Sequence, residues 1–152
     1  MLRLLPAALA AAAVAWAASL AIGPYLVRSG EAPAASALLY RAGAVVCHQR
    51  PDRSFHLAGL PLPVCARCTG LYASGAIAAL LAWIGTATEP RRGRTALLAA
   101  ALPTAMTVAL EWAGVAHVSN ATRALASIPL GLAAGWIFVR TLRAETIRPD
   151  AL

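Results

Sequence analysis

Residues 4–27 read LLPAALAAAAVAWAASLAIGPYLV and contain no charged side chain. A helix needs about 20 consecutive apolar residues to cross the hydrocarbon core of a bilayer, so this run predicts a membrane span. Trp16 and Tyr25 are the kinds of residue that anchor a span at the interface. Arg3 followed by an apolar run is also typical of a cleaved signal peptide, but the run is long for that role, and we expect an uncleaved span.

Three further apolar runs follow, at residues 69–88, 95–114 and 124–139. The second run ends at a charged turn, the third contains the single acid Glu111, and the fourth is bounded by Arg123 and Arg140. Unpaired backbone groups are too costly in lipid, and none of the runs alternates as a barrel strand would, so each is expected to be helical. The sequence therefore predicts an all-α membrane protein of one domain, residues 1–152, with four transmembrane helices.

The composition supports a membrane location. The chain is 60% hydrophobic and 12% charged, with a mean hydropathy of +0.68, whereas a soluble domain is about 25% charged. All 13 basic residues are arginine, and the net charge is +7. These arginines lie mostly between or beside apolar runs rather than on a solvated face with stacking aromatics, so we expect lipid as the partner and no nucleic acid.

Arginine placement also gives an orientation. The short hairpin between the second and third runs and the C-terminal tail are both arginine-rich, and short basic segments favour the cytoplasm. We therefore expect a multi-pass protein of the cell membrane with both termini in the cytoplasm. The segment that carries the cysteines then lies outside.

The segment between the first two spans, residues 28–67, is too long and polar to be a simple turn. Residues 34–46 are expected to form a helix that lies on the membrane or dips into it. All three cysteines lie in residues 47–68, which form a predicted Cys/His loop ending at a C-x-x-C pair, Cys65 and Cys68. Three thiolates and one imidazole are a normal zinc set, which makes Cys47, His48, Cys65 and Cys68 the predicted ligands. Because Cys47 and His48 are neighbours, His56 is an alternative fourth ligand, although hydrogen bonding within the loop explains His56 more simply.

A four-span topology brings a second polar group to the same end of the bundle. Glu111 lies near the end of the third span, and Asn120 and Arg123 lie at the start of the fourth. Charges at a membrane edge are expensive, so we expect Glu111 and Arg123 to pair and to be functional candidates, with Glu111 as a general base. Side chains that could bind an anionic or lipid-like ligand are Arg53, Arg67, Asn120 and Arg123. Ser127, Gly131 and Gly135 recur at helical spacing and are read as a packing seam.

Two other functions remain open. A C-x-x-C at a helix start, beside Arg67, is also typical of thiol-disulfide oxidoreductases, in which Cys65 and Cys68 would cycle and Cys47 would resolve a mixed disulfide. Alternatively, the protein is a non-enzymatic membrane-assembly protein in which the metal holds the loop together.

Two dense blocks carry a resemblance to a known family. CHQRPDRSF at residues 47–55 and PVCARCTGLY at residues 63–72, with Gly59 between them, closely resemble the predicted membrane proteins called domain of unknown function 2085. The likeness extends through Ser119, Asn120 and Arg123. Many members carry Asp-Gly and then Gln in the third span, where this chain has Thr107-Val108 and Glu111, so an acidic role does not carry over to Thr107. The resemblance implies a bacterial or archaeal four-span membrane protein with no established reaction.

Overall fold

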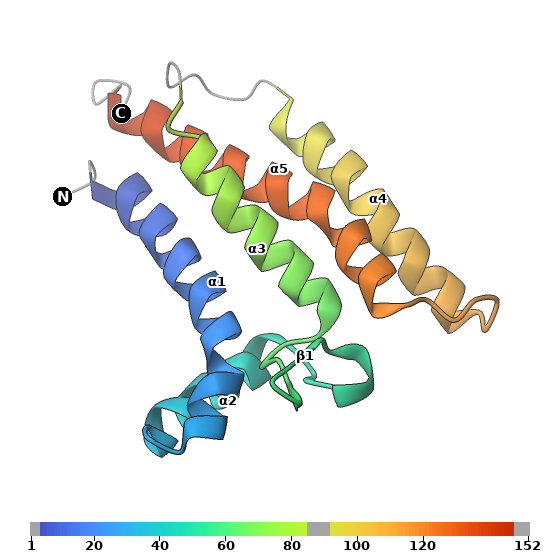
Figure 1. Cartoon of the computed structure of the whole chain (residues 1–152). Helices are drawn as coiled ribbons and strands as arrows, with labels where there is room; N and C mark the ends of the chain where they lie inside the picture. The colour runs from blue at the N-terminus through green and yellow to red at the C-terminus, as the bar shows by residue number, and fades with distance from the viewer. Residues whose placement is uncertain (1–3, 85–91, 148–152) are drawn as a thin grey trace.

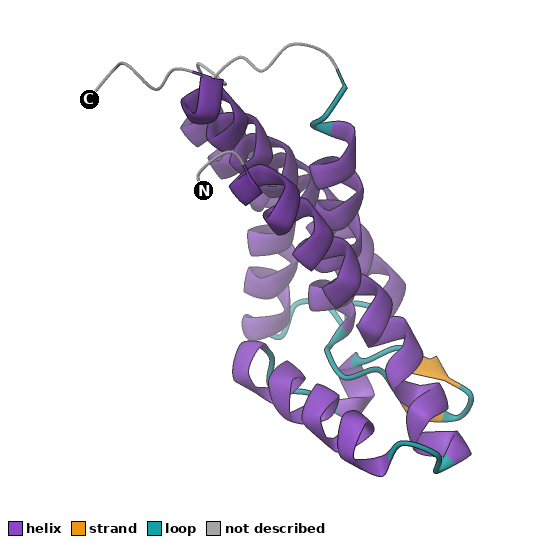
Figure 2. Cartoon of the chain, turned by 90° about the vertical axis from the view of Figure 1, so that its left-hand side faces the viewer, coloured by secondary structure: helices purple, strands orange, loops and turns teal. Residues whose placement is uncertain are grey.

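The computed structural model describes residues 4–84 and 92–147, and its regular elements are almost all helical (Figure 1). In chain order the elements are α1 (Leu5–Ser29), α2 (Pro33–Val46), η2 (Pro51–Arg53), β1 (His56–Leu57), β2 (Leu60–Pro61), α3 (Ala66–Leu81), α4 (Gly93–Trp112) and α5 (Asn120–Ile147). Helices α1, α3, α4 and α5 run alongside one another, and α2, η2 and the antiparallel β1–β2 hairpin lie together at one end (Figures 1 and 2). The predicted all-α architecture is confirmed, with a two-stranded hairpin as its small exception.

Three of the described helices are long and apolar enough to cross a membrane: α1, α4 and α5. Their apolar side chains point largely outward. On α4, for example, Leu98, Leu102 and Met106 follow one another at four-residue intervals and are each more than three fifths exposed. An exposed apolar stripe of this kind would be a liability in water but is what a lipid-facing helix needs.

Two of the four predicted spans, those that correspond to α3 and α5, differ most from the observed helices. Helix α3 begins three residues before the predicted run and ends at Leu81, and residues 85–88 of that run lie outside the described residues. At about 1.5 Å per residue, α3 is about 24 Å long, shorter than the ~30 Å hydrocarbon core. Residues 34–46 were predicted to be helical, and α2 confirms this.

The fourth span was predicted to end before Arg140, but α5 continues to Ile147. The two arginines on this extension have partners that suit a membrane border. Arg140 lies 4.6 Å from the centre of the Trp136 ring, and Arg143 lies 4.7 Å from that of Trp83. Arg143 also donates a hydrogen bond to the carbonyl oxygen of Ala82 near the end of α3, at 2.5 Å. A charged residue therefore marks where the apolar part of α5 ends, not where its backbone stops being helical.

Helices α3 and α5 pack through small residues, as expected for Ser127, Gly131 and Gly135. A Cβ atom added at Gly131 would lie 2.3 Å from the carbonyl oxygen of Leu71, and one added at Gly135 would lie 2.1 Å from that of Gly75. Ser127 is buried in the same seam. Because the backbones touch almost directly, α3 and α5 form the most closely packed pair of helices, and the packing interpretation of this stripe is confirmed.

Candidate metal centre and polar cluster

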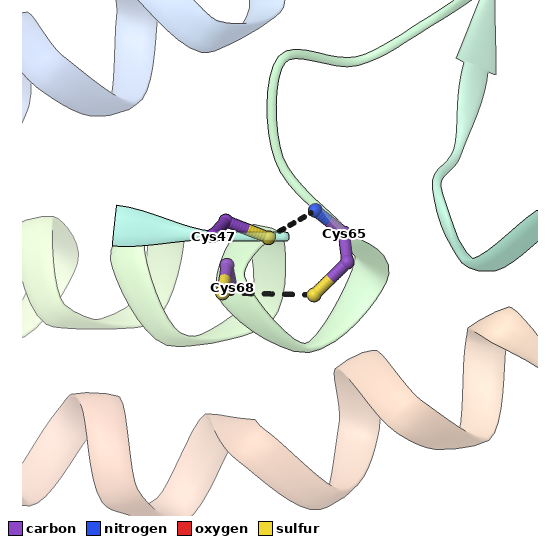
Figure 3. A group of neighbouring side chains, drawn as sticks. All are labelled: Cys47, Cys65 and Cys68. Carbon is purple, nitrogen blue, oxygen red and sulfur yellow. Dashed lines mark hydrogen bonds between the residues drawn. The ribbon is translucent and has the colours of Figure 1, made fainter. Parts of the chain in front are cut away.

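The three cysteines meet at the start of α3, although one of them comes from the end of α2. Their sulfur atoms all lie within 4.8 Å of one another (Figure 3). The Sγ atoms of Cys65 and Cys68 are 3.6 Å apart, and the backbone N–H of Cys65 donates a hydrogen bond to Sγ of Cys47 at 3.2 Å. The structure therefore brings together the three cysteines that the sequence predicted to share one ion.

Hydrogen bonds from side chains to backbone carbonyl groups hold the two cysteine segments together. Gln49 adopts a left-handed conformation, with φ of 47°, and its amide donates to the carbonyl oxygens of Tyr40 at 2.6 Å and Pro63 at 2.7 Å. The Tyr40 hydroxyl donates to the carbonyl oxygen of Pro61 at 2.6 Å. Only glycine fits at Gly43, where a Cβ atom would lie 2.4 Å from the carbonyl oxygen of Pro63. Contacts from residues on both sides of Cys47 thus hold α2 against the segment that precedes Cys65.

The histidines of the loop lie apart from the sulfur atoms. His48 and His56 are both exposed, and among the described residues no fourth His, Cys, Asp or Glu side chain joins the cysteine group. The backbone of Cys47 is extended, with φ of −151° and ψ of 145°. Successive side chains along an extended backbone alternate in direction, so this conformation does not favour one ion shared by Cys47 and His48.

A hydrogen bond links the Cys65 and Cys68 thiols and affects the ionisation of Cys65. Cys65 is the residue before the first turn of α3, and its hydrogen bond with Cys68 lowers the pKa of Cys65 to about 5, although burial opposes this shift. A lowered pKa favours the thiolate, which is the form that binds metal or attacks a disulfide.

The second polar group is centred on Glu111. Arg123 donates to its Oε1 atom through Nε at 3.0 Å, and Arg67 forms an ion pair with its Oε2 atom. The side chains of Glu111, Arg123 and Arg67 are only 8%, 12% and 16% exposed. Arg67 also contacts the hydroxyl group of Thr107 at 3.4 Å. The predicted pairing of Glu111 with Arg123 is confirmed.

Sequence reasoning assigned Arg67 to ligand binding but missed it as a partner of Glu111. Its position at the start of α3, at the same end of the bundle as Glu111, was the available signal. We call Arg67, Glu111, Asn120 and Arg123 the arginine cluster.

Asn120 connects this cluster to the cysteine loop. Its Oδ1 atom accepts a hydrogen bond from Arg123 at 2.6 Å. Its amide nitrogen donates to the carbonyl oxygens of Ser54 at 3.1 Å and Asp52 at 3.4 Å. Arg53 lies outside the cluster: it is 36% exposed and pairs with Asp52 at 3.8 Å. Three of the four predicted ligand-binding side chains are thus brought together, and the fourth lies on the exposed surface of the loop.

The fold and the site together define a class of protein: a helical membrane protein with a cysteine group and an arginine cluster at one end. The chain belongs to the family described as predicted membrane protein DUF2085, which it matches over residues 47–137. This confirms the resemblance and covers both polar regions.

The chain is also similar to two uncharacterised archaeal proteins. One, from Methanocaldococcus jannaschii, is 40% identical over 58 residues, which are 36% of this chain and 37% of the relative. The other, from Methanothermobacter thermautotrophicus, is 52% identical over 27 residues, which are 18% of this chain and 24% of the relative. The matches therefore span well under half the length of either relative. No solved structure matches the chain.

Proposed function

We propose that this chain is a four-span protein of the cell membrane that binds one zinc ion through Cys47, Cys65 and Cys68. The spans would be α1, α3, α4 and α5, with both termini in the cytoplasm and the cysteines outside. The length of α3 is the weakest match to a bilayer, but its position alongside α1 and α5 favours a span that its neighbours shield from lipid (Figure 1).

The separation of the sulfur atoms carries the metal proposal. Tetrahedral zinc with Zn–S bonds of about 2.3 Å holds its sulfur ligands about 3.8 Å apart. The 3.6 Å between the sulfur atoms of Cys65 and Cys68 is close to this value. A disulfide needs about 2.05 Å. The N–H of Cys65, which donates to the Cys47 sulfur, would also stabilise that sulfur as a thiolate.

We further propose that the arginine cluster binds an anionic group, such as the phosphate or carboxylate of a lipid-like molecule. Two guanidinium groups face one carboxylate, so the buried cluster carries an excess of one positive charge. An unbalanced charge at a membrane edge favours a counter-anion. Both oxygens of Glu111 accept from arginines, an arrangement that suits a group positioning Arg67 and Arg123 better than one accepting a proton. A catalytic role for Glu111 and Arg123 remains a prediction.

The same cysteine geometry supports a second candidate function, thiol-disulfide exchange. The Cys65 and Cys68 sulfur atoms need to approach by only about 1.5 Å to reach disulfide distance, and Cys47 is near enough to resolve a mixed disulfide. A structural zinc site in a membrane-assembly protein would use the same three sulfurs.

Metal analysis beside a thiol count separates these functions. The purified full chain should hold one zinc per molecule, and Cys47→Ser, Cys65→Ser and Cys68→Ser should each lower the zinc content. His56→Ala is the matched control and should leave it unchanged, since His56 is exposed and outside the cysteine group. Protein that contains no metal, and loses two thiols reversibly on oxidation, would instead favour the redox function.

A further inference from the structure

The neighbourhood of the cysteines holds few other groups that could complete a metal site. Asp52 pairs with Arg50 at 3.3 Å on the exposed surface of the loop, and both oxygens of Glu111 are taken by arginines. His48 and His56 are exposed, and neither joins the cysteine group.

We infer that the part of the chain that the structure describes supplies only three ligands, so that a bound tetrahedral ion takes its fourth ligand from solution. The inference rests on the proposed metal site and adds to it an exchangeable coordination position. Structural zinc sites are closed by four protein ligands, whereas three protein ligands and a water molecule are the pattern of catalytic sites. The cysteine group therefore matches the open pattern more closely than the closed one.

Charge identifies the class of ligand that this position takes. One divalent ion and three thiolates carry a net charge of −1. An anionic fourth ligand would make the net charge −2, and uncompensated charge is costly at the edge of the membrane. A neutral donor adds no charge. The position is thus suited to water, or to a small neutral nitrogen donor such as an imidazole.

Cobalt substitution tests the inference directly. The full chain in detergent micelles is loaded with Co²⁺, whose thiolate charge-transfer absorption reports the sulfur ligands and whose ligand-field bands report the complete set. Imidazole is then titrated into the wild type and into His48→Ala, with His56→Ala as the control. Because His48 and His56 are exposed, neither substitution should affect folding.

The expected result is that imidazole shifts the ligand-field bands of all three proteins at the same concentration, while the charge-transfer absorption persists. A wild type that does not respond to imidazole, together with altered bands in His48→Ala before imidazole is added, would identify His48 as the fourth ligand and overturn the inference. A complete lack of thiolate charge transfer would have a different meaning: it would overturn the metal site itself, and the open position with it.

Discussion

Glu111→Gln should destabilise the protein more than any other single substitution in the arginine cluster. Glu111 is the only acid there, and its carboxylate separates two guanidinium groups that are 12% and 16% exposed. Without its negative charge, two like charges remain in a poorly solvated site. Breaking a buried ion pair costs about 3 to 5 kcal/mol in soluble proteins. Water near the loop reduces this cost, so we expect a loss of about 3 kcal/mol in the free energy of unfolding.

The arginine substitutions should cost less because each leaves Glu111 with one partner. Arg123→Gln removes the donor that lies 3.0 Å from Oε1, but Arg67 still neutralises the carboxylate. A hydrogen bond to a charged group contributes about 1.5 to 3 kcal/mol, and we expect a loss near the lower value. When Glu111→Gln and Arg123→Gln are combined, Arg67 is the one charge left in the cluster. The double variant should therefore lose about 1 to 2 kcal/mol less stability than the sum of the two single losses.

Equilibrium unfolding in mixed detergent micelles, followed by tryptophan fluorescence, measures all three values. Glu31→Gln and Arg41→Gln are matched controls at exposed positions and should change stability by less than about 0.5 kcal/mol. The reactivity of Cys65 and Cys68 is measured in the same variants, because Arg67 lies between them in the chain. If the single costs simply add, and thiol reactivity is unchanged, the cluster is not one coupled unit and is not connected to the cysteine site.

Gly135→Ala should destabilise the protein by about 1 to 3 kcal/mol, because its Cβ would lie 2.1 Å from a backbone oxygen of α3. Gly75→Ala, whose Cβ would have its nearest atom at 3.4 Å, should cost less than about 1 kcal/mol. Thermal unfolding compares the two variants, and equal costs would contradict close helix packing. Asn120→Ala should loosen the loop, raising amide hydrogen exchange around Ser54, whose carbonyl it binds, while leaving exchange in α1 unchanged; unaltered exchange at Ser54 would mean that the link is unimportant. Reporters fused after Arg94 and at the C-terminus should both be cytoplasmic, and opposite readings would reverse the orientation and place the cysteines inside.

Much of the architecture could be predicted because membrane proteins are limited by a few strong constraints. Long uncharged runs must become helices, and the antiparallel order of successive helices brings alternate helix ends to one face. This is enough to place the cysteines, Glu111 and Arg123 together. The pairing of Glu111 with Arg123 follows as well, since neither charge is stable alone near lipid.

The features that were missed depend on contacts between distant segments. The end of α5 could not be predicted from Arg140, because a basic residue can remain helical when an aromatic ring and the interface are available to it. The pairing of Arg67 with Glu111 could be predicted only with knowledge that the Arg67 side chain points toward α4. The positions of His48 and Cys47 depend on an extended backbone at the end of α2, and no residue spacing reveals that conformation.

The close contact between α3 and α5 also has a consequence for how the protein is made. Helix α3 leaves the ribosome well before α5, and it meets α5 through small residues that include Gly70, Ser74 and Gly75. At 16 residues, this helix is shorter than the run of about 20 that a single span needs. We therefore expect the proposed α3 span to become stable in the membrane only once α5 packs against it.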